Sequence, residues 1–202
     1  TIVIAAGDAT GSTAAEFNTI NDATTVAVDL TNVTALAASS LSDLGTLATA
    51  ITNNEFSNDT GLTTIAVSDT TIDATTLATR IDSFDTINGG GTTGMTLAAG
   101  ATINVDAAEI THMLADESAS RLTISDQKIT VTNAITVDTA NLLGATTTGV
   151  VTATINTSET VTELATLSAD GGTNKLTIAI RGADATGATA AQLNTINDAT
   201  SV

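Results

Sequence analysis

The stretch Thr13-Ala14-Ala15-Glu16-Phe17, which runs on to Ile20, decides the fold that the sequence predicts. A Thr at the start of a helix accepts a hydrogen bond from the N–H three residues later, and a Glu at that later position reaches back to the N–H of the Thr. Phe17 and Ile20 are three residues apart and therefore share one face of such a helix. The stretch predicts a short amphipathic helix that begins with a capping box.

The same pattern occurs seven times along the chain. The cap of each predicted helix is Thr13, Asp43, Asp73, Asp106, Asp138, Thr160 or Thr189. These positions are separated by 30, 30, 33, 32, 22 and 29 residues, a spacing that is typical of a repeat architecture. The third residue after the cap is Glu or Gln in four copies, and in the other three it is Thr46, Thr76 and Asn141.

A longer period lies above the short one. Residues 1–26 align with residues 177–202 without a gap, at an offset of 177 − 1 = 176, and 18 of the 26 positions are identical. We therefore predict one continuous array over residues 1–202, with about six coils in each 176-residue super-repeat.

The segments between the predicted helices favour β-strands. They alternate Thr with Val, Ile or Leu, as in Thr102-Ile103-Asn104-Val105, and Gly-rich or Asn-rich turns separate them. The fold class predicted from this pattern is a β-solenoid with one short capped α-helix per coil. Stacked strands lie about 4.8 Å apart and packed helices about 8–10 Å apart, so either the array curves or each coil supplies two strand rungs per helix. Paired strand segments in most coils favour the second arrangement.

Charge excludes several classes of partner. The formal net charge is −17, with only five Lys and Arg residues. Nucleic acid phosphates and anionic membrane surfaces both require a basic surface, so we expect neither partner. The sequence has no apolar run of about 18 residues that could cross a bilayer, and it has no Cys for disulfides or thiolate metal sites.

Catalytic residue sets are not apparent. His112 is the single histidine, so a zinc set or a Ser-His-Asp arrangement is excluded. We expect His112 to be a surface residue. The carboxylate pairs Asp69 with Asp73 and Asp116 with Glu117 are interpreted as caps and solvated turns. We predict that the chain is not an enzyme and has no cofactor.

Calcium is the one ligand that the sequence leaves open. Acidic turns recur at Gly7-Asp8, Asp59, Ser68-Asp69 and Asp170-Gly171, and carboxylates are the ligands that Ca²⁺ prefers. The nonapeptide of calcium-loaded β-rolls and the EF-hand loop are both absent. No ligands can therefore be assigned, and the metal residues stay unknown.

The sequence resembles the very large, acidic, Thr/Ala-rich repeat proteins that bacteria, including marine cyanobacteria, display on or release from the cell surface. The resemblance is clearest in the segment Asp-Ala-Thr-Gly-x-Thr-Ala-Ala at residues 8–15 and 184–191, continued by Asn-Thr-Ile-Asn-Asp-Ala-Thr at residues 18–24 and 194–200. It implies an extracellular or cell-surface location and a structural role.

Two functions remain after these exclusions. The first is a structural repeat segment of an extracellular filament, surface coat or giant cell-surface protein, whose partner is a further copy of itself through tandem repeats or head-to-tail stacking. The second is a binding module, such as an adhesin or phage tail-fibre shaft, with a carbohydrate-binding or ice-binding surface. The absence of Trp and Tyr counts against stacking on sugars.

Overall fold

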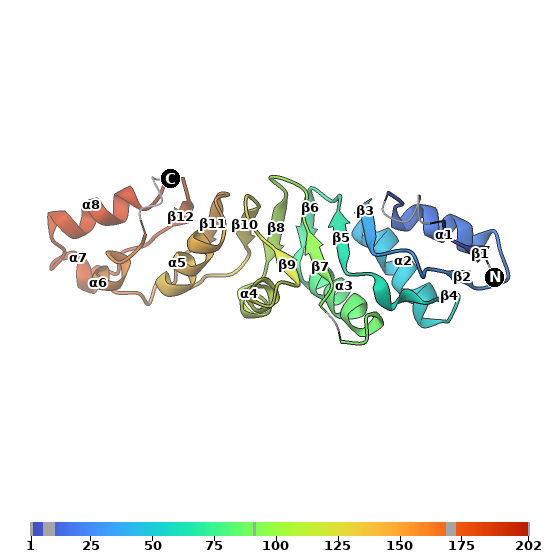
Figure 1. Cartoon of the computed structure of the whole chain (residues 1–202). Helices are drawn as coiled ribbons and strands as arrows, with labels where there is room; N and C mark the ends of the chain where they lie inside the picture. The colour runs from blue at the N-terminus through green and yellow to red at the C-terminus, as the bar shows by residue number, and fades with distance from the viewer. Residues whose placement is uncertain (1, 6–10, 91, 169–172, 202) are drawn as a thin grey trace. The chain divides into compact units, whose positions relative to one another are not determined.

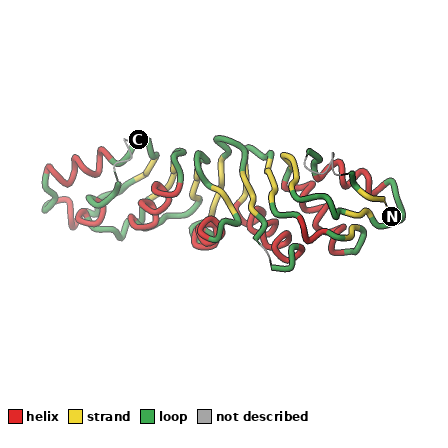
Figure 2. Tube along the Cα trace, in the orientation of Figure 1, coloured by secondary structure: helices red, strands yellow, loops and turns green. Residues whose placement is uncertain are grey.

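The structure is a computed structural model that describes residues 2–5, 11–90, 92–168 and 173–201. The chain divides into two compact units. The first unit comprises residues 1–98 and 111–124, and the second comprises residues 99–110 and 125–202. Helices and strands alternate along the chain in both units, as Figure 1 labels them and Figure 2 colours them.

The first unit holds two parallel sheets. One has the strand order β1-β2-β4 and the other the order β3-β5-β7-β9. The strands of these two sheets are β1 (Ile2–Val3), β2 (Val28–Asp29), β3 (Ala35–Ser39), β4 (Phe56–Ser57), β5 (Thr64–Val67), β7 (Gly94–Thr96) and β9 (Leu122–Thr123), and β6 (Thr71–Asp73) belongs to neither sheet. Its helices are α1 (Ala14–Asp22), α2 (Leu41–Thr52), α3 (Ala74–Ile87), most of α4 (Ile110–Ser118) and a 3₁₀ turn at Asp59–Gly61.

The second unit supplies four strands of a five-stranded parallel sheet, in the order β12-β11-β10-β8. These strands are β8 (Thr102–Val105), β10 (Lys128–Val131), β11 (Val151–Thr154) and β12 (Lys175–Thr177). The helices are α5 (Val137–Thr146), α6 (Val161–Leu164), α7 (Gly182–Ala185) and α8 (Ala190–Asp198).

The pairing register aligns apolar residues across the strands. Ile103 pairs with Ile129, Ile129 with Val151, and Ala153 with Leu176. All five side chains are buried. Because residues two apart point to the same face of a strand, the alternating Thr and Ile or Val pattern places the aliphatic side chains inside and Thr outside. The first unit has an equivalent core, which includes Leu44, Leu47, Ile65, Ile81 and Met95.

The prediction of a β-solenoid is wrong. The described residues form an α/β fold with three parallel sheets of three, four and five strands and with eight α-helices. Parallel neighbours such as β3 and β5 are joined through a helical crossover, as parallel strands require. The helices α2 and α3 are 12 and 14 residues long, longer than the short helices that the capping pattern predicted, and they bury several apolar residues each. The filament and extracellular assignments likewise find no support in the structure.

The prediction of strands from alternating Thr and aliphatic residues fails at Ile135-Thr136-Val137. This segment alternates as a strand does, but only Ile135 makes an isolated bridge, with Ile155. Val137 is the first residue of α5, because Thr136 accepts a hydrogen bond from the N–H of Thr139 and so begins the helix.

Candidate functional site

Among the described residues, complete capping boxes lie at Thr13, Thr160 and Thr189. In α1 the Thr13 Oγ1 accepts from the N–H of Glu16 at 3.3 Å, and the Glu16 Oε2 accepts from the N–H of Thr13 at 2.8 Å. The boxes of α6 and α8 have the same geometry. The hydrogen bond from the Thr backbone lowers the pKa of the Glu16 and Glu163 carboxyls. These side chains are occupied by helix capping.

Asp73 and Asp106 also accept backbone hydrogen bonds. Asp73 is the N-cap of α3, and its Oδ1 accepts from the N–H of Thr76 at 2.9 Å. Asp106 instead closes a turn by accepting from the N–H of Ala108 at 2.9 Å, and α4 begins only at Ile110.

The caps predicted at Asp43 and Asp138 are wrong. Ser40 is the N-cap of α2 and accepts from the N–H of Asp43 at 3.0 Å, and Thr136 is the N-cap of α5. An N-cap oxygen must lie just before the first turn to reach the N–H three residues later. Asp43 is itself that third residue, and Asp138 lies in the first turn of α5. The signal in the sequence was Ser40, three residues before Asp43, and Thr136, two residues before Asp138. Each can cap the helix one step earlier than the Asp.

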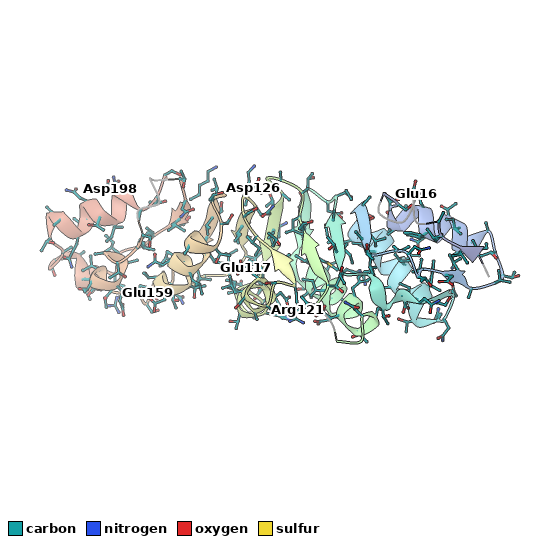
Figure 3. All side chains as sticks on the ribbon, viewed as in Figure 1. Glu16, Glu117, Arg121, Asp126, Glu159 and Asp198 are labelled. Carbon is teal, nitrogen blue, oxygen red and sulfur yellow. The ribbon has the colours of Figure 1, made fainter. Side chains whose placement is uncertain are left out.

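A charged cluster joins α3, α4 and the residue before β9. The guanidinium of Arg121 contacts Asp85 Oδ2 through Nη1 at 2.9 Å and Asp116 Oδ1 through Nη2 at 2.5 Å. Asp82 Oδ1 lies 3.7 Å from Nη1. Figure 3 shows Arg121 among the side chains of this part of the chain. The single guanidinium of Arg121 therefore lies within ion-pair distance of three carboxylates, which come from two helices.

Asp116 is the buried member of this cluster. Its side chain is 1% exposed, and burial raises its pKa above the ordinary value, while the charges of Arg121 and His112 oppose that rise. The interpretation of Asp116 as part of a solvated turn is wrong. The side chain of His112 is 41% exposed, and its Nε2 lies 3.8 Å from Asp116 Oδ2. The spacing of four residues between His112 and Asp116 was a signal that the two could meet on one helix face.

The acidic turns that left calcium open are partly described. Gly7-Asp8 and Asp170-Gly171 lie outside the described residues. Asp69 Oδ2 accepts from the N–H of Leu41 at 2.8 Å, a contact between neighbouring repeats. Within the part of the chain that the structure describes, no three His, Asp or Glu side chains are grouped to hold a metal ion. Calcium binding stays a prediction.

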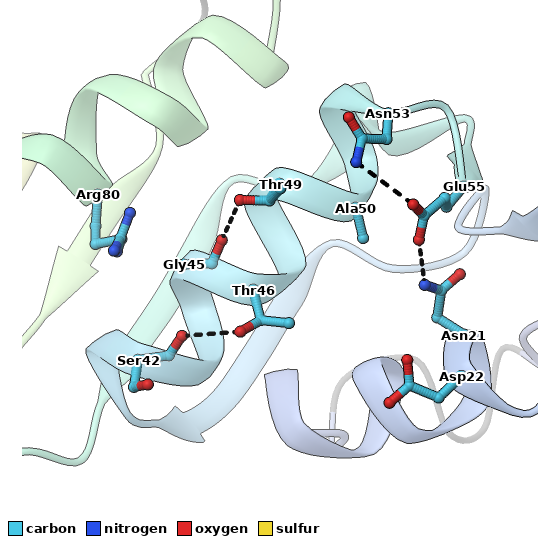
Figure 4. Close-up of a pocket in the computed structure, with 10 residues that line it drawn as sticks. All are labelled: Asn21, Asp22, Ser42, Gly45, Thr46, Thr49, Ala50, Asn53, Glu55 and Arg80. Atoms are coloured by element: carbon cyan, nitrogen blue, oxygen red, sulfur yellow. Dashed lines mark hydrogen bonds between the residues drawn. The ribbon is translucent and has the colours of Figure 1, made fainter.

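A polar groove of about 510 Å³ lies between α1 and α2, with Arg80 of α3 at its edge (Figure 4). The hydroxyls of Thr46 and Thr49 donate to the carbonyls of Ser42 and Gly45. The Arg80 Nε donates to the carbonyl of Leu41 at 3.1 Å, and its guanidinium lies so close to Gly45 that a Cβ there would come within 2.5 Å.

The groove also contains Asn21 of α1, whose Nδ2 donates to Glu55 Oε2 at 2.5 Å. The Thr46 and Thr49 hydroxyls bond within α2 itself. The contacts that join different elements are those of Asn21 with Glu55 and of Arg80 with the carbonyl of Leu41.

Ligand crevices in open α/β sheets form where the strand order reverses. The orders β1-β2-β4 and β3-β5-β7-β9 each run in one direction along the chain. Among the described strands of these two sheets there is no such reversal.

Comparisons with known protein families, with curated proteins and with solved structures found no match. The resemblance to bacterial surface repeat proteins therefore stays a prediction, as do the absence of catalysis and of nucleic acid partners. No helix among the described residues is both long enough and apolar enough to cross a membrane.

Proposed function

We propose that this chain is a non-catalytic structural repeat segment, built so that further copies of the repeat can join it in register. The observation that carries the proposal is the difference in burial between α1 and α8. These two helices have nearly the same sequence, 176 residues apart, and each buries apolar positions that the other leaves exposed or half-buried.

The first face contains Ala14 and Phe17 in α1. Both are buried, and Ala14 donates its N–H to Ser39 Oγ of β3 at 2.9 Å. The equivalent residues of α8, Ala190 and Leu193, are exposed. In α1, therefore, this face packs against the repeat that follows it in the chain.

The second face adjoins the first, because residues three apart are neighbours on a helix, and it contains Ile196 and Ala199 in the α8 region. Both are buried, at 6% and 1% exposure. The equivalent residues near α1 are Ile20, which is half-buried, and Ala23, which is exposed. A helix of this sequence with a repeat on each side would bury both faces, as expected for a unit within a tandem array.

Buried polar side chains tie neighbouring repeats together. Thr147 Oγ1 donates to the carbonyl of Gln127 at 2.6 Å, and Asn174 Oδ1 accepts from the N–H of Val151 at 2.9 Å. Each bond satisfies a buried backbone group of the preceding repeat. This use of buried polar groups supports a structural role.

The proposal is tested with a longer chain in which residues 27–202 are repeated after Val202. The residues that cover α1 would then follow α8. We expect amide hydrogen exchange in residues 190–198 of the first copy to slow by at least about tenfold, because local opening would now expose buried apolar surface. Exchange in α5 is the internal control and should not change. Unchanged exchange in residues 190–198 would contradict the proposal.

The alternative of a binding module receives no support from the aromatic residues. Phe17, Phe56 and Phe84 are all buried, at 1%, 3% and 1% exposure, and the sequence has no Trp or Tyr. Sugar recognition by stacking requires an exposed ring. An adhesin or tail-fibre shaft that binds carbohydrate or ice, and placement at a cell surface, stay predictions.

A further inference from the structure

A second polar groove lies between α2 and α3, and Arg80 of α3 lines it. Its volume is about 340 Å³, within the range of about 300–1,000 Å³ that small-molecule sites occupy. Both helices belong to the first unit, so the groove lies within one compact unit. The groove between α1 and α2 has Asp22 and Glu55 in its lining, whereas no Asp or Glu is among the described residues that line the α2–α3 groove.

The guanidinium of Arg80 has no anionic partner among the residues that the structure describes. Its Nε donates to the carbonyl of Leu41 at 3.1 Å, and neither Nη1 nor Nη2 has an acceptor within the described chain. The two carboxylates that follow on α3, Asp82 and Asp85, contact Arg121 instead. The N–H groups of a guanidinium form a fork that matches the two oxygens of a carboxylate. The donors on Nη1 and Nη2 therefore remain available to an anion from outside the chain.

Gly45 of α2 makes room for the Arg80 side chain. A Cβ at position 45 would come within 2.5 Å of Arg80 Cζ and Nη2, and Figure 4 shows Arg80 reaching from α3 toward Gly45. Residues 46–49 of α2 and residues 76–79 of α3 both read Thr-Leu-Ala-Thr, and this alignment places Thr75 at the position of Gly45. The repeat therefore does not require glycine there. Glycine destabilises a helix interior relative to alanine, so the close approach of the guanidinium is the reason for Gly45.

The hydroxyl groups of the α2–α3 groove already donate their protons. Thr49 and Thr52 of α2 donate to the carbonyls four residues earlier, both at 2.9 Å. Ser83 and Thr86 of α3 do the same at 2.7 and 2.8 Å. A hydroxyl has one proton and two lone pairs, so each of these oxygens can still accept a hydrogen bond from a ligand. The groove thus offers one cation and several acceptors to the same molecule.

This combination selects a ligand that is both an anion and a hydrogen-bond donor. A carboxylate fits the Arg80 fork, and hydroxyl groups on the same molecule can donate to the Thr and Ser oxygens. Sulfate has no such donors, and a neutral sugar has no charge for Arg80. The net charge of −17 opposes anions in general, but exposed charges farther away than about 8 Å are largely screened at physiological salt.

We propose that the α2–α3 groove binds a sugar acid of the uronate class. Its carboxylate lies on the Nη1 and Nη2 fork of Arg80, and its hydroxyls donate to oxygens on both helices, among them Thr52 and Thr86. Recognition by an ion pair and hydrogen bonds does not require an exposed aromatic ring. The inference goes beyond the proposed function, because a structural repeat can exist with or without such a site.

Titration of the full chain with D-glucuronate, followed by heteronuclear NMR spectroscopy, tests the proposal. We expect saturable shifts of the amide signals of α2 and α3 and of the Arg80 Nε–H signal. Arg80→Gln keeps an N–H donor near the Leu41 carbonyl but removes the charge, so it should weaken binding by at least about tenfold. Arg80→Lys keeps the charge without the fork and should weaken binding by a smaller factor.

Replacement of the hydroxyls tests the acceptor side of the groove. Thr52→Val and Thr86→Val should each weaken binding by about two- to tenfold, the range expected for one hydrogen bond. Thr79→Val is the matched control: Thr79 also lies on α3 and donates to the carbonyl of Thr75 at 2.8 Å, but it does not line the groove. Its replacement should leave the affinity unchanged.

The choice of ligand tests the chemical class. Acetate has the carboxylate without the hydroxyls and glucose has the hydroxyls without the carboxylate, so each should bind at least about tenfold more weakly than D-glucuronate. Tighter binding of an oligogalacturonate would identify an acidic polysaccharide as the source of the uronate, and equal binding would identify the free sugar acid. The absence of saturable shifts with D-glucuronate, equal affinity in Arg80→Gln, or equal affinity for acetate would each overturn the proposal.

Discussion

Phe17 and Leu193 occupy the same position in two copies of one helix, and Phe17 is buried while Leu193 is 41% exposed. Truncation of a buried aromatic residue removes its transfer free energy and leaves a cavity. We expect Phe17→Ala to lower the free energy of unfolding by about 3–5 kcal/mol. The matched variant Leu193→Ala should lower it by less than about 1 kcal/mol. Urea titration followed by circular dichroism measures both, and equal losses would show that the two faces are buried alike.

Gly149 lies against the backbone of the preceding repeat. A Cβ at this position would come within 2.3 Å of the carbonyl oxygen of Gln127, and a backbone atom cannot move aside as a flexible side chain does. We expect Gly149→Ala to destabilise the second unit by about 1–3 kcal/mol. Gly182 has open space around its Cβ position, so Gly182→Ala should change the stability by less than about 0.5 kcal/mol. The comparison of thermal midpoints of the two variants is decisive, and similar midpoints would refute the close contact.

The capping box of α1 should depend on pH. The hydrogen bond from the Thr13 backbone lowers the pKa of Glu16, so its contribution to stability is present above the unfolded-state pKa and is lost as the pH falls through the folded-state pKa. Glu16→Gln should retain the cap at acid pH, as Gln192 does in α8. Amide exchange of α1 at pH 3 and pH 6 tests this: the wild type should lose protection at the lower pH, and the variant should not. Equal losses in both would remove Glu16 as the cause.

The contribution of Asp116 to stability should depend on pH in the opposite direction from that of Glu16. Burial raises its pKa, so its contribution to stability is fully present below the unfolded-state pKa and is lost as the pH rises through the folded-state pKa. Asp116→Asn removes this ionisation. We expect the stability of the variant relative to wild type to increase as the pH rises above about 4, the ordinary pKa of Asp, and then to level off. A difference that is constant from pH 3 to pH 7 would contradict the assignment.

Replacement of Arg121 tests how much its ion pair with Asp116 contributes to stability. Arg121→Met should destabilise the first unit, because Asp116 would be left buried without its cation. The double variant Arg121→Met with Asp116→Leu should recover much of the loss, since neither buried charge would remain. A double-mutant cycle from denaturant titrations gives the coupling between the two residues. A coupling near zero would mean that the 2.5 Å contact contributes nothing to stability.

The sequence by itself determined the local features of this protein. Thr13 with Glu16, Thr160 with Glu163 and Thr189 with Gln192 form capping boxes, because a cap involves only residues three apart. The strands at residues 102–105 and 151–154 follow from the alternation of apolar and polar side chains, which depends on the period of an extended chain. The 176-residue period is likewise a property of the sequence alone.

Only the tertiary structure decided how these pieces are assembled. The division of the strands into three parallel sheets depends on which strands pair, and periodicity is the same for every pairing. The ion pair of Asp116 is also decided by the tertiary structure, because the Arg121 guanidinium that contacts it is shared with Asp85 of α3, which lies 116 − 85 = 31 residues earlier. The clearest case is the difference in burial between Phe17 of α1 and Leu193 of α8, which lie in nearly identical local sequences. Residues of β3 and α2 cover α1, whereas nothing among the described residues covers the equivalent face of α8. Burial is a property of neighbours in space, which a local sequence pattern does not contain.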